Sequence, residues 1–281
     1  MADPLRPDLE QALAEWARRV RANREQVEQY REDAPRDDHY APLAQNFRAD
    51  PRRTDDPVLN ALRTLTQPDE TWLDIGAGGG RYALPLALAT RRVIAVDPSP
   101  GMLAVLRTAM AEERIDNVEV IQARWPAADP PASAVHADVA FISHVGYDIE
   151  QIGPFLEAME RAANRCVSVL FRRRPTWAAD ELWPAVHGVQ RAALPALPEL
   201  LCVQLARDKA FELRYVELPP ITYESPDFVL TFARIQTWVN PGGEKDLRLQ
   251  AVLRERLMER DGRVAFSWDP VKVGILTWPS R

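Results

Sequence analysis

The sequence predicts an α/β fold with a doubly wound, mostly parallel sheet. Two observations lead to this fold class: short apolar stretches alternate with helical ones, and the first two apolar stretches each end in an acidic residue, the first of them running on into glycines. Five alternations of strand and helix are typical of a parallel sheet with helices on both faces. The strands are expected at Trp72–Ile75, Arg92–Val96, Val118–Gln122, Val139–Ser143 and Cys166–Phe171.

The first strand contains Asp74 near its end and continues into a glycine-rich turn, in the segment WLDIGAGGGRY. Glycine tolerates positive φ and carries no Cβ, so the turn can be tight and a ligand can lie against bare amide groups. The dinucleotide fingerprint G-x-G-x-x-G would need a third glycine at position 81, where this chain has Arg81. Asp74 repels a pyrophosphate and attracts an ammonium or sulfonium group. The turn therefore points toward S-adenosylmethionine.

The second strand ends in Asp97, which lies 97 − 76 = 21 residues after Gly76. In nucleotide-binding βαβ units, an acid that accepts the ribose hydroxyls lies about 20 residues after the first glycine. The alternative is a simple turn residue before Pro98. The agreement of strand, spacing and glycine turn favours the ribose.

Four segments together resemble the motifs of class I S-adenosylmethionine-dependent methyltransferases: WLDIGAGGGRY, VIAVDPSPGML, NVEVIQARWPA and ADVAFISHV. The likeness runs from about Pro57 to Phe171. It implies a Rossmann-like methyltransferase fold with a seven-stranded sheet. In that family the last two strands form an antiparallel pair, which would be Phe211–Val216 with Val271–Trp278.

The resemblance implies S-adenosylmethionine as the cofactor, with the glycine turn holding its methionine part, Asp97 its ribose and Met102 its adenine. Many relatives carry an acid after the third strand, where this chain has Ala123, Arg124 and Trp125, so an adenine contact through a carboxylate is in doubt. Tyr40 is a candidate donor to the methionine carboxylate, and a place in a surface loop is the equal alternative. The expected cofactor-binding residues are Tyr40, Asp74, Gly76, Ala77, Gly78, Asp97, Pro98, Met102, Arg124, Trp125 and Ser143.

Methyl transfer from a sulfonium needs an in-line nucleophile about 3 to 3.5 Å from the methyl carbon and a site closed to water. If the acceptor is an oxygen or an acidic carbon, a base is needed too. His144, after the fourth strand, is the candidate base, with Tyr147 beside it. The alternative is a histidine that only packs or bonds to backbone. Further candidates for an acceptor site are Arg172, Arg173, Arg174, Trp183 and His187, although a solvated charge run is favoured for the three arginines.

We expect residues 1–55 to form an N-terminal helical cap and residues 56–281 the methyltransferase domain. Within the latter, 177–207 and 225–260 are helical additions that would form a substrate lid, including helices at Pro226–Val239 and Glu244–Glu259. The amphipathic helix Pro7–Tyr30 either packs on the main domain or forms a homodimer contact.

Composition narrows the class of partner. The 281 residues carry a net charge of −6, which argues against a broad nucleic-acid surface and favours a small-molecule acceptor. Cys166 and Cys202 have no metal-ligand spacing, so no metal is expected. The absence of a long apolar run predicts a soluble, cytoplasmic protein that does not bind membranes. The fourth-strand segment SHVGY lacks the N/D-P-P-Y/F motif of base- and glutamine-methylating relatives.

Two other functions stay open at this point. A non-catalytic protein that binds S-adenosylmethionine or S-adenosylhomocysteine and acts through a partner would keep Asp74 and Asp97. A nicotinamide-dependent oxidoreductase is disfavoured by Arg81.

Overall fold

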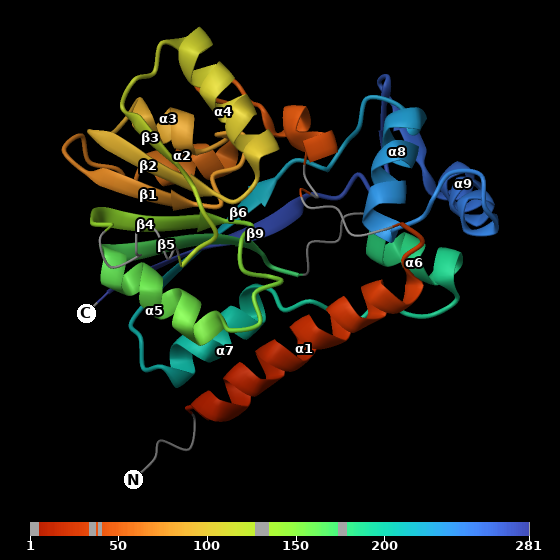
Figure 1. Ribbon diagram of the computed structural model, residues 1–281, viewed down its shortest axis with the longest axis horizontal. Helices are drawn as coiled ribbons and strands as arrows, with labels where there is room; N and C mark the ends of the chain where they lie inside the picture. Colours follow the sequence, from red (N-terminus) through yellow and green to blue (C-terminus); the bar gives the residue numbers. More distant parts are fainter. Residues whose placement is uncertain (1–5, 34–37, 39–40, 127–134, 174–178, 281) are drawn as a thin grey trace.

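A mostly parallel β-sheet forms the centre of the protein (Figure 1). The structure is a computed structural model that describes residues 6–33, 38, 41–126, 135–173 and 179–280. Within these residues, seven strands pair in the order β3 (Val118–Gln122), β2 (Arg92–Asp97), β1 (Thr71–Ile75), β4 (Ala137–Ser143), β5 (Ala163–Phe171), β9 (Val271–Pro279) and β6 (Glu212–Leu218). β9 runs antiparallel to β5 and β6, whereas the remaining pairs are parallel. This confirms the predicted doubly wound sheet and its antiparallel pair.

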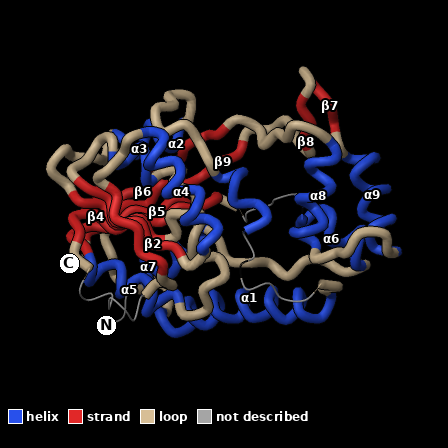
Figure 2. The backbone as a smooth tube through the Cα atoms, turned by 45° about the horizontal axis from the view of Figure 1, so that its top comes forward, coloured by secondary structure: helices blue, strands red, loops and turns tan. Residues whose placement is uncertain are grey.

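Helices cover both faces of the sheet (Figures 1 and 2). One face carries α2 (Pro57–Arg63), α3 (Ala83–Ala87) and α4 (Pro100–Glu113), and the other carries α5 (Ile152–Ala162) and α7 (Leu197–Ala206). Asp56 caps α2 by accepting a hydrogen bond from the Leu59 amide at 3.0 Å, and Pro57 is the first helical residue, as predicted. Ser99 caps α4 in the same way.

A second hydrophobic core lies beside the sheet, in a region that we call the helical lobe. The lobe contains α6 (Ala179–His187), α8 (Pro226–Thr237), α9 (Glu244–Arg256) and a hairpin of β7 (Met258–Arg260) and β8 (Arg263–Ala265). α7 does not belong to it, because Leu197 and its neighbours on α7 join the main core. The predicted addition 177–207 is thus divided between two cores. Side chains at the centre of the lobe include Leu182, Val186, Val229, Leu249 and Leu253.

The helical lobe is connected to the sheet at the edge where the parallel strands end. β5 ends at Phe171 before α6, β6 ends at Leu218 before α8, and β9 begins at Val271 after the hairpin. Leu218 pairs with Val271, so these two connections leave the sheet side by side. The lobe therefore stands at the carboxyl edge, where ligands bind in open α/β sheets.

α1 (Leu9–Tyr30) contacts both the main domain and the helical lobe (Figures 1 and 2). Its middle is buried through Trp16, whose indole Nε1 donates to the Ile149 carbonyl at 2.8 Å. At its end, the Tyr30 ring meets the edges of Trp183 and His187 in the lobe. The apolar stripe is thus buried within the chain, as the first of the two interpretations expects. None of the helices in the described part is both long and apolar enough to cross a bilayer.

The hairpin of β7 and β8 differs from the prediction of one helix over Glu244–Glu259. α9 ends at Arg256, and Met258 and Glu259 pair with β8 instead. The physical reason is the turn between the strands, where Asp261 has φ 52° and Gly262 φ 70°. An Asp-Gly pair with both residues at positive φ is a favoured two-residue hairpin turn.

Candidate active site

The candidate site lies where loops leave β1, β2 and β4 at the carboxyl edge. β1 has β2 on one side and β4 on the other, so the chain after β1 and the chain after β4 diverge at this point of the sheet. Such a switch point is the usual ligand crevice of an open α/β sheet. It gathers Asp74 and the glycine turn from β1, Asp97 from β2, and Ser143 and His144 from β4.

The glycine turn depends on two glycines that no other residue could replace without movement. Gly76 has φ 77°, and a Cβ there would lie 2.3 Å from the Val145 Cγ2 atom. Gly80 has φ 86°, and a Cβ there would lie 2.5 Å from the Leu106 Cδ1 atom. The turn after β4 and helix α4 therefore pack directly against the glycine backbone.

Asp74 is a buried carboxyl group with no hydrogen-bond donor among the described residues. Only 3% of the residue is exposed. Burial, and after it the nearby Asp97 carboxylate, raise the pKa of Asp74 to about 8. A buried carboxyl group without a hydrogen-bond donor is unfavourable, and a second acid beside it adds to the cost. A cationic ligand would supply the missing partner.

Asp97 is held by the backbone on both sides. Its Oδ2 accepts from the Gly78 amide at 2.9 Å and its Oδ1 accepts from the Ser99 amide at 2.8 Å. Burial raises the pKa of Asp97, while these two hydrogen bonds oppose that rise. Each carboxylate oxygen can accept a second hydrogen bond, so two ribose hydroxyls can still be bound.

Asp38 joins the site from the N-terminal segment and was not among the predicted site residues. Its carboxylate accepts from the Ser99 hydroxyl at 2.8 and 2.9 Å and from the Gly101 amide at 3.1 Å. It lies close enough to Asp97 to raise the pKa of that residue. No spacing rule would have found Asp38, because 61 residues separate it from Ser99. The predicted Tyr40, two residues later, lies outside the described residues.

The expected adenine contacts divide into buried and exposed residues. Met102 is 4% exposed, and it packs with Val105 and with Ala44 and Phe47 from the 3₁₀ helix η1 (Ala41–Phe47). Trp125 is 6% exposed, and its indole Nε1 has no hydrogen-bond partner among the described residues. Pro98 and Arg124 are exposed, whereas Ala77 is buried in the glycine turn.

Ser143 and His144 close the site at the end of β4. The buried Ser143 hydroxyl oxygen finds no partner within the described part of the chain. His144 adopts a left-handed backbone with φ 56°, and its ring stacks on Phe171 with the centroids 4.2 Å apart. Its backbone amide donates to the Val169 carbonyl at 2.9 Å.

The Tyr147 hydroxyl lies between the Phe171 amide and the His144 ring. The Tyr147 hydroxyl oxygen accepts from the Phe171 amide at 2.9 Å and lies 3.1 Å from His144 Nδ1. The Tyr147 hydroxyl and Nδ1 thus share one hydrogen bond, and the tautomer of the imidazole decides which of the two donates. Burial lowers the pKa of His144 to about 4, and the Arg81 charge lowers it too. His144 is thus neutral near pH 7 and hydrogen-bonded to Tyr147 through Nδ1.

The other predicted candidates lie apart from this cluster. Trp183 and His187 are buried in the helical lobe beside Tyr30, and His187 Nε2 donates to the Thr237 carbonyl at 2.9 Å. Arg172 and Arg173 are exposed. Arg174 lies outside the described residues.

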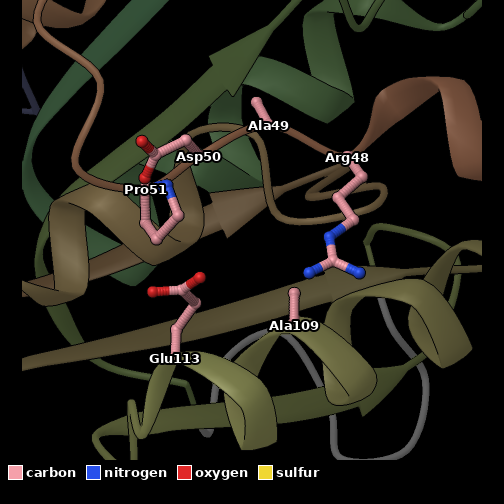
Figure 3. A pocket seen from close by; sticks show the side chains of 6 residues that line it. All are labelled: Arg48, Ala49, Asp50, Pro51, Ala109 and Glu113. Carbon is pink, nitrogen blue, oxygen red and sulfur yellow. The ribbon is translucent and has the colours of Figure 1, made fainter.

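A pocket of about 350 Å³ lies between residues 48–51 and the α4 residues Ala109 and Glu113 (Figure 3). The Arg48 and Glu113 side chains point into it from opposite walls. Ion pairs of Arg48 with Glu112 and of Arg52 with Glu113 connect the same segment to α4. We interpret this pocket as part of the attachment of the N-terminal segment.

Comparison with known proteins identifies the central part of the chain. Residues 73–165 match the methyltransferase domain family. The chain contains a class I methyltransferase domain. A probable ribosomal RNA small subunit methyltransferase A from Methanosphaera stadtmanae is 36% identical over 70 residues, which cover 24% of this chain and 26% of that protein. An uncharacterized Haemophilus influenzae protein is 33% identical over 101 residues, 36% of each chain.

Solved structures share the fold of this methyltransferase domain at low sequence identity. The YcgJ protein from Bacillus subtilis has a TM-score of 0.52 and 14% identity, over 79% of this chain and 97% of that chain. A cyclopropane-fatty-acyl-phospholipid synthase-like protein from Lactobacillus casei has a TM-score of 0.54 and 14% identity, over 85% and 98%. The matched segments of this chain cover about a quarter to a third of the length of these two curated relatives.

Proposed function

We propose that the protein is an S-adenosylmethionine-dependent methyltransferase that acts on a small-molecule acceptor. The observation that supports this most strongly is Asp74, a buried carboxyl group without a donor beside Asp97. The unpaired Trp125 indole nitrogen and Ser143 hydroxyl at the same edge of the sheet are further polar groups that a ligand can satisfy. This donor and acceptor set fits a cationic adenosyl cofactor better than a pyrophosphate.

In this proposal the residues bind and orient the two reactants. The cofactor supplies a methyl group that its sulfonium already activates. Asp97 accepts the ribose hydroxyls, Met102 and Trp125 border the adenine, and Asp74 faces the cationic part. The remaining task of the protein is to hold a nucleophile in line with the methyl carbon, at about 3 to 3.5 Å, and to exclude water.

In this proposal His144 is the base. Its hydrogen bond with Tyr147 sets a condition on that role. His144 Nδ1 is hydrogen-bonded to the Tyr147 hydroxyl, so accepting a substrate proton at Nδ1 needs that hydroxyl to turn away. A low pKa makes His144 a weak base near pH 7. Acceptors that lose their proton easily, or need no base, suit this site best.

The helical lobe supports a small acceptor rather than a nucleic acid. It is joined to the sheet at the edge that carries the site, and we propose that it forms the acceptor side. One relative is named as a ribosomal RNA methyltransferase, but the net charge of −6 on this chain argues against a polyanion. A homodimer through the N-terminal helix and a cytoplasmic location are also part of the proposal.

Calorimetric titration with S-adenosylmethionine, S-adenosylhomocysteine and NADH tests the proposal. We expect micromolar binding of both adenosyl ligands and none of NADH, with a loss of binding in Asp97→Ala because the ribose hydroxyls lose their acceptor. Lack of adenosyl binding by the wild-type protein would contradict the proposal, and tight NADH binding would favour an oxidoreductase. Once an acceptor that needs a base is found by screening, His144→Ala should abolish turnover and retain cofactor binding.

A further inference from the structure

β6 is an edge strand whose outer side has no strand partner in the described part of the chain. It pairs with β9 at every position from Glu212 to Leu218, without a bulge. Edge strands expose a row of backbone N–H and C=O groups, and proline, lysine or a bulge often protects them from other strands. The segment ELRYVEL of β6 contains neither proline nor lysine, and it carries charges of both signs. The edge can therefore pair with another strand whose charges match.

The two faces of β6 differ in chemistry, because successive side chains point to opposite faces of the sheet. Leu213 lies on the α7 side, where it and Leu197 would both meet a Cβ placed at Gly274. Arg214 lies on the α2 side, where its Nη1 is 3.5 Å from the Thr64 hydroxyl oxygen. The α7 face thus carries an apolar row along this edge, and the α2 face carries two opposite charges. The apolar row consists of Phe211, Leu213 and the 52% exposed Tyr215, and the charges are the exposed Glu212 and Arg214.

These charges select one way of pairing β6 with a second β6. In a symmetric antiparallel pair, a twofold axis passes through one residue, and residues at equal distances on either side of it face each other. An axis at Glu212 or at Arg214 opposes two like charges, and an axis at any later residue of the strand brings no opposite charges of the strand together. An axis at Leu213 places Glu212 opposite Arg214 of the partner subunit, and Arg214 opposite Glu212 of the partner subunit. On the other face it places Phe211 opposite Tyr215 of the partner subunit, with the two copies of Leu213 between them.

We propose that β6 binds β6 of a second copy of this chain, antiparallel and with the twofold axis at Leu213. This pairing joins two seven-stranded sheets into one continuous sheet. Because the axis reverses the strand direction, the carboxyl edges of the two copies point in opposite directions and each copy keeps its own candidate site. The surface differs from the N-terminal helix, whose apolar stripe is buried within the chain. The inference does not depend on the proposed function.

A charge-swap experiment on the full chain tests the proposal. Sedimentation equilibrium at chain concentrations up to about 100 μM, which also populate weak interfaces, should show a dimer of the wild-type protein. Glu212→Arg opposes two arginines across the axis, and Arg214→Glu opposes two acids, so each single variant should raise the dissociation constant of the dimer at least about tenfold. The double variant Glu212→Arg/Arg214→Glu restores both pairs with exchanged signs, and its dissociation constant should return to within about threefold of the wild-type value.

A mixture of the two single variants separates pairing from structural damage. A subunit with Glu212→Arg presents arginines at both positions, and a subunit with Arg214→Glu presents acids at both, so their heterodimer contains two opposite-charge pairs. The mixture should therefore dimerise at a concentration at which each variant alone is a monomer. Two substitutions of exposed residues elsewhere serve as controls and should keep the dimer: Glu119→Arg on β3, the other edge strand of the sheet, and Leu9→Arg on α1.

Several outcomes would overturn this inference. A wild-type protein that stays monomeric over the whole concentration range is one of them. A dimer that withstands both single variants, or one that Leu9→Arg abolishes, places the contact on another surface such as the N-terminal helix. Loss of the dimer in the single variants without recovery in the double variant or in the mixture reduces the effect to structural damage, which the unfolding temperature of each variant also reports. Titration of the same proteins with S-adenosylmethionine tests the proposed function separately.

Discussion

The substitution Asp74→Asn removes the charge of the buried carboxyl group and keeps the size and shape of the side chain. At an effective dielectric constant of 20, a carboxylate and a cation about 4 Å apart attract each other by about 4 kcal/mol. With a pKa of about 8, removing the Asp74 proton at pH 7 costs about 1.4 kcal/mol. The difference, about 2.6 kcal/mol, predicts close to a hundredfold weaker binding of S-adenosylmethionine by the variant.

The same pKa predicts that cofactor binding releases a proton. Near pH 7 the empty protein holds about 0.9 proton on Asp74, and a bound cation would displace it. Calorimetry at pH 7 in two buffers of different ionisation enthalpy measures this release directly. The wild-type affinity should rise about tenfold between pH 6 and 7, whereas the affinity of Asp74→Asn should not change.

Stability without ligand should show the opposite trend with pH. A carboxyl group whose folded pKa is raised stabilises the fold fully below its unfolded value of about 3.9, and this stabilisation is lost as the pH rises through about 8. The free energy of unfolding of the wild-type protein should therefore fall relative to Asp74→Asn between about pH 5 and 8 and change little above that. The exposed Asp116 supplies the control, Asp116→Asn. Cofactor binding without proton release, or an equal loss of affinity in the control, would refute the reasoning.

Three further predictions concern the loops around this carboxyl group. Gly76→Ala should lower the free energy of unfolding by about 1 to 3 kcal/mol, since its Cβ meets Val145 and its φ is positive; denaturant unfolding equal to wild type would contradict this. Tyr147→Phe leaves the Phe171 amide and His144 Nδ1 without their partner, so the same assay should show a loss of about 1 to 3 kcal/mol. Because the folded pKa of His144 is depressed to about 4, its stabilising effect is complete above about pH 6.5 and is lost as the pH falls toward 4. The wild-type protein should therefore lose stability relative to His144→Gln over that interval, and parallel pH profiles of the two proteins would argue against it.

Most of the central fold could be predicted from the sequence because its signals are local. β1 is buried at every position, so its apolar run is continuous, and Asp74 and Asp97 mark the ends of two strands. Proline after a capping residue predicts the starts of α2 and α4. These signals lie within a few residues of the features that they predict.

The parts that the sequence did not predict depend on contacts between distant segments. Asp38 reaches Ser99 across 61 residues, and the helical lobe builds a core of its own from helices separated by α7 and β6. Periodicity predicts these helices but not the surface on which they pack. The β7–β8 hairpin is different, because the pair Asp261 and Gly262 was a local signal that pointed to a turn.

The position of α1 has a mechanical consequence. At 1.5 Å per residue, its 22 residues form a stiff rod of about 33 Å that is fastened at Trp16 to the sheet side and at Tyr30 to the lobe. These two contacts hold the lobe and the sheet side at opposite parts of one helix. Removal of the rod would leave the lobe hanging on its chain connections at the carboxyl edge. α1 therefore ties the lobe to the α5 side of the sheet, although it lies far in sequence from the glycine turn.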